Sequence, residues 1–148
     1  MLLEQNNIKS LKDIDYIKGS HLIINRTLES GLMFSDKNNS RYIFALPYKD
    51  KVLLGTTEEK VSHPEFPEIT NDEIEYLIDS FNQILNKPIS KSEIISTYSG
   101  VRPLIKSKDN FHKSTRDFFI QENDSLLTIF GGKWTTSPSI ARKIVTMI

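Results

Sequence analysis

Two arginines in the second half of the chain have side chains suited to binding an anion. Arg102 stands directly before Pro103, and a residue in that position is held in extended backbone, which limits where its guanidinium can reach. The planar guanidinium donates paired hydrogen bonds that match a phosphate or a carboxylate. Arg116 could add a second contact, although its neighbour Asp117 is an obvious partner for a structural ion pair. These positions predict an anion site and leave the role of Arg116 open.

A glycine-rich turn near the C-terminus is suited to contact with a flat ligand. Residues 130–136 read Phe-Gly-Gly-Lys-Trp-Thr-Thr, which predicts a strand that ends in two glycines and a helix that begins with hydroxyl residues. Glycine lets the backbone approach a ligand closely, and the unpaired N–H groups at a helix start favour negative charge. The structural alternative is an ordinary glycine turn into a capped helix.

His21 follows Gly19 and Ser20 at the start of a predicted strand. A histidine can exchange a proton near neutral pH, although a lone histidine at a strand end is commonly just a polar residue. The motif Gly-Thr-Thr-Glu at 55–58 is expected to fix its turn through threonine hydrogen bonds. Histidines and carboxylates do not share a metal-ligand spacing, so no metal is expected, and no serine stands in a nucleophile elbow.

The hydrophobic pattern predicts an α+β fold that positions these residues. Short apolar or β-branched runs separated by polar turns predict strands near 21–25, 41–47, 51–57, 94–104, 115–121 and 126–130. We expect the strands at 21–25, 41–47, 51–57 and 115–121 to join one mainly antiparallel sheet. The short connection after Pro47 predicts a hairpin.

Two helices are expected beside the strands. A capping box formed by Thr70 and Glu73, followed by apolar residues at helical spacing, predicts a helix over 71–86 that ends before Pro88. This helix is expected to cover an apolar face of the sheet. A final helix from about Thr135 to the C-terminus is expected to bury Ile140, Ile144 and Val145.

Composition excludes several classes of function. Nineteen basic and nineteen acidic residues cancel, so no long-range field favours nucleic acid or anionic lipid as a partner. The absence of cysteine excludes disulfides and thiolate chemistry, so redox work would need a bound cofactor. A length of 148 residues suits one domain. The chain shows no secretion signal and no apolar run long enough to cross a bilayer, so a cytoplasmic location is expected.

Four motifs together resemble those of the FAD-dependent glycerol-3-phosphate dehydrogenases, a branch of the D-amino-acid-oxidase-like flavoproteins. They are Gly19-Ser20-His21, Gly55-Thr56-Thr57-Glu58, Tyr98-Ser99-Gly100-Val101-Arg102-Pro103-Leu104 and Phe130-Gly131-Gly132-Lys133-Trp134-Thr135-Thr136. The resemblance covers residues 17–148, whereas residues 1–16 form an unmatched N-terminal segment. The chain departs from the usual pattern at Glu58, where aspartate is common, at Trp134, where an aliphatic residue is common, and at Ser137-Pro138.

The resemblance implies a substrate domain with covering helices and assigns a role to each motif. His21 would take or orient the hydroxyl proton of glycerol 3-phosphate while hydride leaves for the flavin, and Arg102 and Arg116 would hold the substrate. The residues expected to face FAD are Gly131, Gly132, Lys133, Thr135 and Thr136. His21, Arg102 and Lys133 are expected to carry the chemistry and to converge on one concave surface.

The six glycines supply no Gly-x-Gly-x-x-Gly loop, the feature with which a Rossmann half holds the pyrophosphate of FAD. We therefore expect the chain to lack that N-terminal half, to bind FAD weakly and to be inactive unless a separate FAD-binding half is supplied. The family passes electrons to quinone, so membrane contact would be at most peripheral, at the inner membrane. Two alternatives remain open: part of an amino-acid oxidase of the same superfamily, or a non-catalytic remnant or interaction module.

Overall fold

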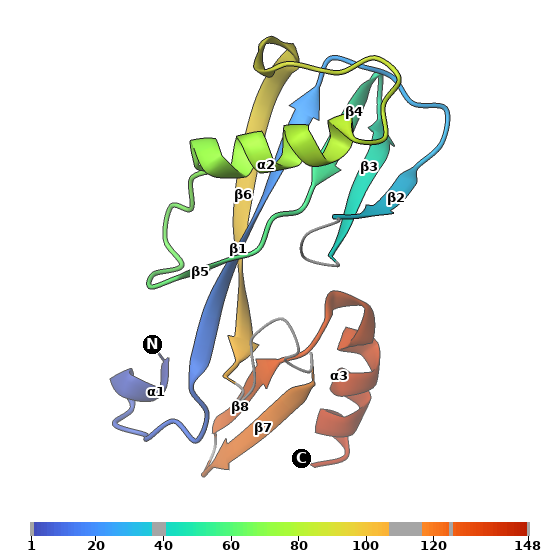
Figure 1. Ribbon diagram of the computed structural model, residues 1–148. Helices are drawn as coiled ribbons and strands as arrows, with labels where there is room; N and C mark the ends of the chain where they lie inside the picture. Colours follow the sequence, from blue (N-terminus) through green and yellow to red (C-terminus); the bar gives the residue numbers. More distant parts are fainter. Residues whose placement is uncertain (1, 37–40, 107–116, 125, 148) are drawn as a thin grey trace. The chain divides into compact units, whose positions relative to one another are not determined.

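The computed structural model describes residues 2–36, 41–106, 117–124 and 126–147. The chain forms two compact units (Figure 1). Unit 1 combines residues 1–16 with residues 103–148, and unit 2 is the continuous stretch Ile17–Arg102. The chain therefore passes between the units twice. Both passages lie inside strands, the first in β1 (Ile14–Ile24) and the second in β6 (Ile94–Ile105).

Unit 2 is built on a six-stranded sheet. Its order is β2-β3-β4-β1-β5, and β6 also pairs with β1. The pairings β2–β3, β3–β4 and β1–β4 are antiparallel, as expected for a mainly antiparallel sheet. The remaining strands are β2 (Leu32–Ser35), β3 (Tyr42–Tyr48), β4 (Lys51–Gly55) and β5 (Glu59–Val61). The predicted hairpin is confirmed, because Tyr48 pairs with Lys51 across a two-residue turn.

Helix α2 (Asn71–Asn82) lies across one face of this sheet (Figure 1). The predicted capping box is confirmed: the Glu73 backbone N–H donates to the Thr70 hydroxyl, and the Glu73 carboxylate accepts from the Thr70 N–H. The core between helix and sheet consists of Leu22, Ile24, Ile43, Ala45, Val52, Leu54, Leu77, Ile78, Phe81 and Ile89. This burial of apolar side chains is the main force that holds unit 2 together.

Helix α2 ends four residues earlier than the sequence predicts. The side-chain amide of Asn82 accepts a hydrogen bond from the Ile89 N–H at 2.8 Å and donates to the Ile89 carbonyl at 3.0 Å. This pair of bonds folds the chain back after the helix, toward the 3-10 turn η1 (Lys91–Glu93). Ile84, which the longer helix would have placed on the apolar face, is 46% exposed.

The other face of the sheet is apolar and open to solvent. On β3 the side chains of Tyr42, Phe44, Leu46 and Tyr48 are exposed, while the alternating Ile43 and Ala45 are fully buried. Phe44 pairs with Gly55, and Gly55 pairs with His21. Because paired residues of neighbouring strands share a face, His21 belongs to this open face.

Unit 1 contains a two-stranded antiparallel sheet of β7 (Phe118–Asn123) and β8 (Leu126–Gly131). The prediction that the strand near 115–121 joins the main sheet is therefore wrong: in the part of the chain that the structure describes, β7 pairs with β8 alone. Pairing with a strand only two residues away closes a much smaller loop. Arg116 lies outside the described residues.

Unit 1 also contains the N-terminal segment and a helix near the C-terminus. The N-terminal segment, which includes α1 (Leu2–Gln5), is fixed by the buried side chain of Gln121, which accepts from the Leu11 N–H and donates to the Lys9 carbonyl, each at 2.9 Å. The 3-10 turn η3 (Trp134–Thr136) leads into α3 (Ser137–Val145). Among the described helices, none has the length and apolarity needed to cross a membrane.

Helix α3 buries Ile140, as predicted, and half-buries Ile144. The prediction that it also buries Val145 is wrong, because that side chain is 70% exposed. Residues four apart share a helix face, whereas residues five apart do not. Val145 therefore points away from the face that Ile140 defines.

Candidate functional site

His21 lies in the middle of the open sheet face of unit 2. Its imidazole stacks on the Tyr98 ring from β6, with 4.6 Å between ring centroids and 6° between ring planes. On the neighbouring strand, a Cβ added to Gly55 would collide with the imidazole, so glycine makes room for the ring. The Nδ1 atom of His21 is buried and has no hydrogen-bond partner in the described part of the chain.

Arg102 at the end of unit 2 is held above another glycine. A Cβ on Gly19 would lie 2.6 Å from the Arg102 Nη2 atom, so the guanidinium needs a bare backbone beneath it. The Arg102 Nη1 atom lies 3.5 Å from Glu58 Oε1, and Glu58 Oε2 lies 3.6 Å from Arg41 Nη2. Glu58 thus bridges two arginines. Sequence reasoning noted Glu58 only as a departure from the family pattern and missed this pairing.

His21 and Arg102 line one cavity of about 370 Å³. The full lining is Gly19, His21, Thr56, Tyr98, Gly100, Val101 and Arg102. Burial and, secondarily, the positive charge of Arg102 lower the pKa of His21 below its ordinary value of 6.5. The imidazole is therefore neutral at neutral pH and able to accept a proton next to an anion-binding side chain.

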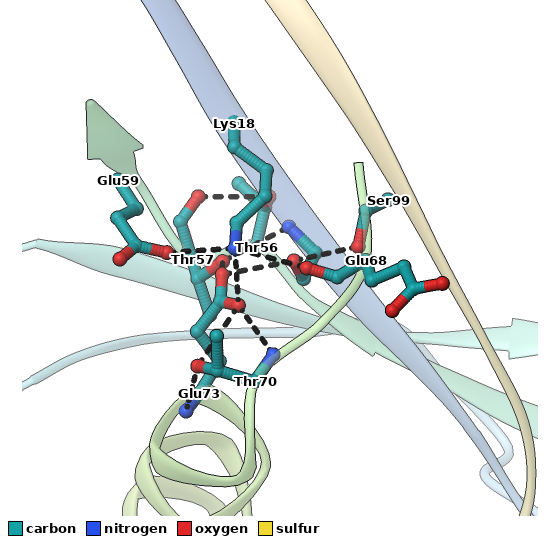
Figure 2. Close-up of polar contacts among 9 residues, drawn as sticks. Lys18, Thr56, Thr57, Glu59, Glu68, Thr70, Glu73 and Ser99 are labelled. Carbon is teal, nitrogen blue, oxygen red and sulfur yellow. Dashed lines mark hydrogen bonds and ion pairs between the residues drawn. The ribbon is translucent and has the colours of Figure 1, made fainter. Parts of the chain in front are cut away.

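A largely buried polar network joins the sheet to the start of α2, and Figure 2 shows its contacts. The Lys18 ammonium lies 2.9 Å from Glu73 and 2.7 Å from Glu59, and it donates to the Glu68 carbonyl at 3.0 Å. Glu73 also accepts from the hydroxyls of Thr57 at 2.6 Å and Ser20 at 2.9 Å. Burial opposes its ionisation, but these bonds and the bond from the Thr70 N–H together outweigh burial and lower the pKa of Glu73 from 4.5 to about 2.

The two threonines of the Gly-Thr-Thr-Glu motif have the structural role that the sequence predicts. The Thr57 hydroxyl accepts from the Ser20 N–H at 2.9 Å while it donates to Glu73. The Thr56 hydroxyl donates to the Thr57 carbonyl at 3.1 Å. These bonds join the end of β4 to β1 and to helix α2, and they fix the backbone on which His21 and Arg102 depend.

The glycine-rich turn belongs to unit 1. Gly131 and Gly132 have positive φ angles of 69° and 89°, a backbone conformation that glycine adopts readily. The turn borders a hollow of about 370 Å³ whose other walls include Trp134, Ile140 and Ile144. Lys133 is exposed.

The two threonines that follow the turn are exposed, and Thr136 shapes the turn itself. The Lys133 N–H donates to the Thr136 hydroxyl at 3.1 Å, and that hydroxyl donates back to the Lys133 carbonyl. The side chains of Lys133, Trp134 and Thr135 are exposed as well. The turn thus combines an internal hydrogen-bonded frame with exposed polar groups above a partly apolar hollow.

The structure brings together part of the site that the sequence predicts. His21 and Arg102 share one cavity, although 80 residues separate them in the chain. Lys133 and the other residues expected to face FAD stand in unit 1, and their convergence with His21 stays a prediction. The second arginine of the predicted substrate site, Arg116, is outside the described residues.

The sequence matches the family model of FAD dependent oxidoreductases over residues 3–147. The chain therefore belongs to the FAD-dependent oxidoreductase family. Within it, the chain is similar to glycerol-3-phosphate dehydrogenases, which confirms the resemblance noted from the motifs. A mitochondrial enzyme of Arabidopsis thaliana is 37% identical over 120 residues, and the aerobic enzyme of Escherichia coli is 35% identical over 137 residues.

These matches cover most of this chain and a small part of each relative. They span 78% and 86% of this chain but 19% and 27% of the Arabidopsis and Escherichia coli proteins. The fold is similar to the crystal structure of the glycerol-3-phosphate dehydrogenase from Bacillus halodurans complexed with FAD. That similarity has a TM-score of 0.83 at 26% identity and covers 99% of this chain and 29% of that one.

Proposed function

We propose that this chain is the substrate-domain portion of an FAD-dependent glycerol-3-phosphate dehydrogenase, which oxidises sn-glycerol 3-phosphate to dihydroxyacetone phosphate and passes electrons to quinone. The observation that carries the proposal is the cavity that places His21 beside Arg102. A proton acceptor next to an anion-binding guanidinium is what oxidation of a phosphorylated alcohol needs. The expected cytoplasmic location, with at most peripheral membrane contact, is part of the same proposal.

The cavity residues of unit 2 have different roles in this proposal. Arg102 binds the phosphate of the substrate, and its ion pair with Glu58 helps to hold the guanidinium in place. His21, neutral because its pKa is lowered by burial and by Arg102, accepts the proton of the substrate hydroxyl. Because Nδ1 is buried, we assign that proton to Nε2. Tyr98 and Thr56 form part of the cavity wall.

The strand-to-helix turn of unit 1 fits the flat part of a flavin. Two glycines at positive φ leave the backbone bare, and the hollow beside them has an apolar wall from α3, as expected for a site that takes a planar aromatic ring. We assign Gly131, Gly132, Lys133, Thr135 and Thr136 to that contact. When bound, FAD would accept the hydride that leaves the substrate carbon.

The pyrophosphate loop that supplies much of the FAD affinity in such folds is not in this sequence. We therefore expect the purified chain to quench FAD fluorescence weakly and to reduce no dye with glycerol 3-phosphate. Adding the separately expressed N-terminal FAD-binding half of a relative should restore dye reduction. In that assembly Arg102→Lys, which keeps the charge and loses the paired donors, should raise the KM for glycerol 3-phosphate.

Two outcomes would count against the proposal. A stoichiometrically yellow chain that oxidises glycerol 3-phosphate unaided would show a complete catalyst rather than a portion of one. An Arg102→Lys variant whose KM for glycerol 3-phosphate is unchanged in a working assembly would remove Arg102 from the phosphate site.

A further inference from the structure

The orientation of His21 has an unusual basis. A histidine that exchanges protons is commonly held by a hydrogen bond to its second ring nitrogen. Here Nδ1 is buried without such a partner in the described part of the chain. The carboxylate that pairs with Arg102 of this cavity, Glu58, is engaged with Arg41 as well. Something other than a hydrogen bond from Nδ1 must therefore fix the plane of the ring.

Two neighbours confine the imidazole. The Tyr98 ring covers one side in a nearly parallel stack, 4.6 Å away between centroids, and Gly55, the cross-strand partner of His21, lies against the ring on the adjacent strand. The ring also separates two spaces: the 370 Å³ cavity that contains Arg102, and an apolar hollow of about 120 Å³ lined by Phe44, Leu46 and Leu53 among others. A turn of the imidazole would carry its nitrogens toward this mostly apolar hollow, where the side chains of Phe44, Leu46 and Leu53 offer no hydrogen-bond partner.

We propose that Tyr98 is a positioning residue for the reaction proposed above: its stacking sets the plane of the His21 ring in the wall of the cavity that His21 shares with Arg102. The effect of this stacking on catalysis rests on the proposed function of His21. The stack itself is a property of the isolated chain. The phenol hydroxyl has no part in it, so an aromatic ring of similar size suffices, and an aliphatic side chain does not.

Nuclear magnetic resonance of the isolated chain tests the stack. Wild type should show contacts between the His21 and Tyr98 ring protons and an upfield ring-current displacement of the His21 resonances. Tyr98→Phe should keep both the displacement and the lowered pKa of His21, whereas Tyr98→Leu should lose the displacement and raise that pKa toward 6.5, because the imidazole becomes more hydrated. Tyr42→Leu, an exposed tyrosine on β3, is the matched control and should change neither.

The catalytic meaning is tested in the assembly with an FAD-binding half. Tyr98→Leu should lower kcat roughly 10-fold to 100-fold, the range expected when a reacting group is misplaced, with the KM for glycerol 3-phosphate nearly unchanged and Tyr98→Phe close to wild type. Missing ring contacts in wild type, or an unchanged kcat in Tyr98→Leu, would overturn the positioning role. An unchanged kcat in His21→Gln would instead refute the proposed function of His21 and leave the stack standing.

Discussion

Glu73 is the residue on which the buried polar contacts of unit 2 converge. It combines the capping of helix α2 with hydrogen bonds to Thr57 and Ser20 and an ion pair to Lys18. The sequence indicates only the first of these roles, because the capping box is a local pattern of two residues three positions apart. The other contacts link positions up to 55 apart in the chain, and no short pattern predicts them.

Removing the Glu73 carboxylate should destabilise unit 2. We expect Glu73→Ala to lower the free energy of unfolding by about 3–5 kcal/mol, since a buried ammonium and two buried hydroxyls would lose a partner. Urea unfolding followed by circular dichroism measures it. The control is Glu75→Ala on the same helix, whose ion pair with Lys91 is more than half exposed on both sides and should contribute under about 1 kcal/mol. Equal losses of unfolding free energy in the two variants would contradict the claim that the Glu73 network stabilises the fold.

The lowered pKa of Glu73 predicts how the stability of the fold depends on pH. The pKa of Glu73 is about 2 in the folded chain against an ordinary 4.5, so the charged carboxylate favours folding above pH 4.5. That contribution should disappear as the pH falls from about 4.5 to about 2. Urea midpoints measured through this range should drop in wild type and drop less in Glu73→Gln. A smaller residual slope is expected from Glu93 and Asp50, whose pKa values are also lowered.

At the scale of elements, the predicted pairing of β1, β3 and β4 in one sheet is confirmed, whereas the predicted end of α2 and the predicted partner of β7 are wrong. The β3–β4 hairpin and the start of α2 are encoded in adjacent residues, and both are where the sequence places them. The partner of β7 depends on which strand lies nearest in three dimensions, and the sequence-based prediction was wrong there. The same limit applies to the site. The glycine motifs and the arginine before Pro103 identified candidate site residues, but no sequence pattern predicted that Glu58 pairs with both Arg41 and Arg102.

The connection from β8 to α3 should tolerate little change. Gly132 has a φ of 89°, and a Cβ there would lie 2.9 Å from the Ile140 Cδ1 atom. We expect Gly132→Ala to destabilise unit 1 by about 1–2 kcal/mol through backbone strain. Amide hydrogen exchange of β7 and β8 measures this effect. Gly100→Ala is the matched control, because its Cβ would meet nothing within 4 Å, and faster exchange of β7 and β8 in that variant as well would contradict the explanation.

At the scale of the whole molecule, Trp134 reports on assembly. It is the single tryptophan of the chain and is 92% exposed. We expect the isolated chain to emit as a solvated indole that iodide quenches readily. Binding of an FAD-containing partner half should shift the emission to shorter wavelength and reduce quenching, because apolar surface of this size is typically covered in an interface. Restored dye reduction with unchanged Trp134 emission would place that turn outside the assembled site.

The discontinuity of unit 1 has a consequence for how the polypeptide matures on the ribosome. Unit 2 is one uninterrupted stretch, so it can fold as soon as its last strand has left the exit tunnel. Unit 1 needs its first sixteen residues and its last forty-six together, and the bonds from Gln121 to Lys9 and Leu11 span 112 and 110 residues. Domains generally fold in the order in which they are synthesised. Residues 1–16 therefore remain without their Gln121 contacts until Gln121 has been synthesised. A nascent chain stalled before Gln121 would present that segment to proteases and chaperones while unit 2 is already protected.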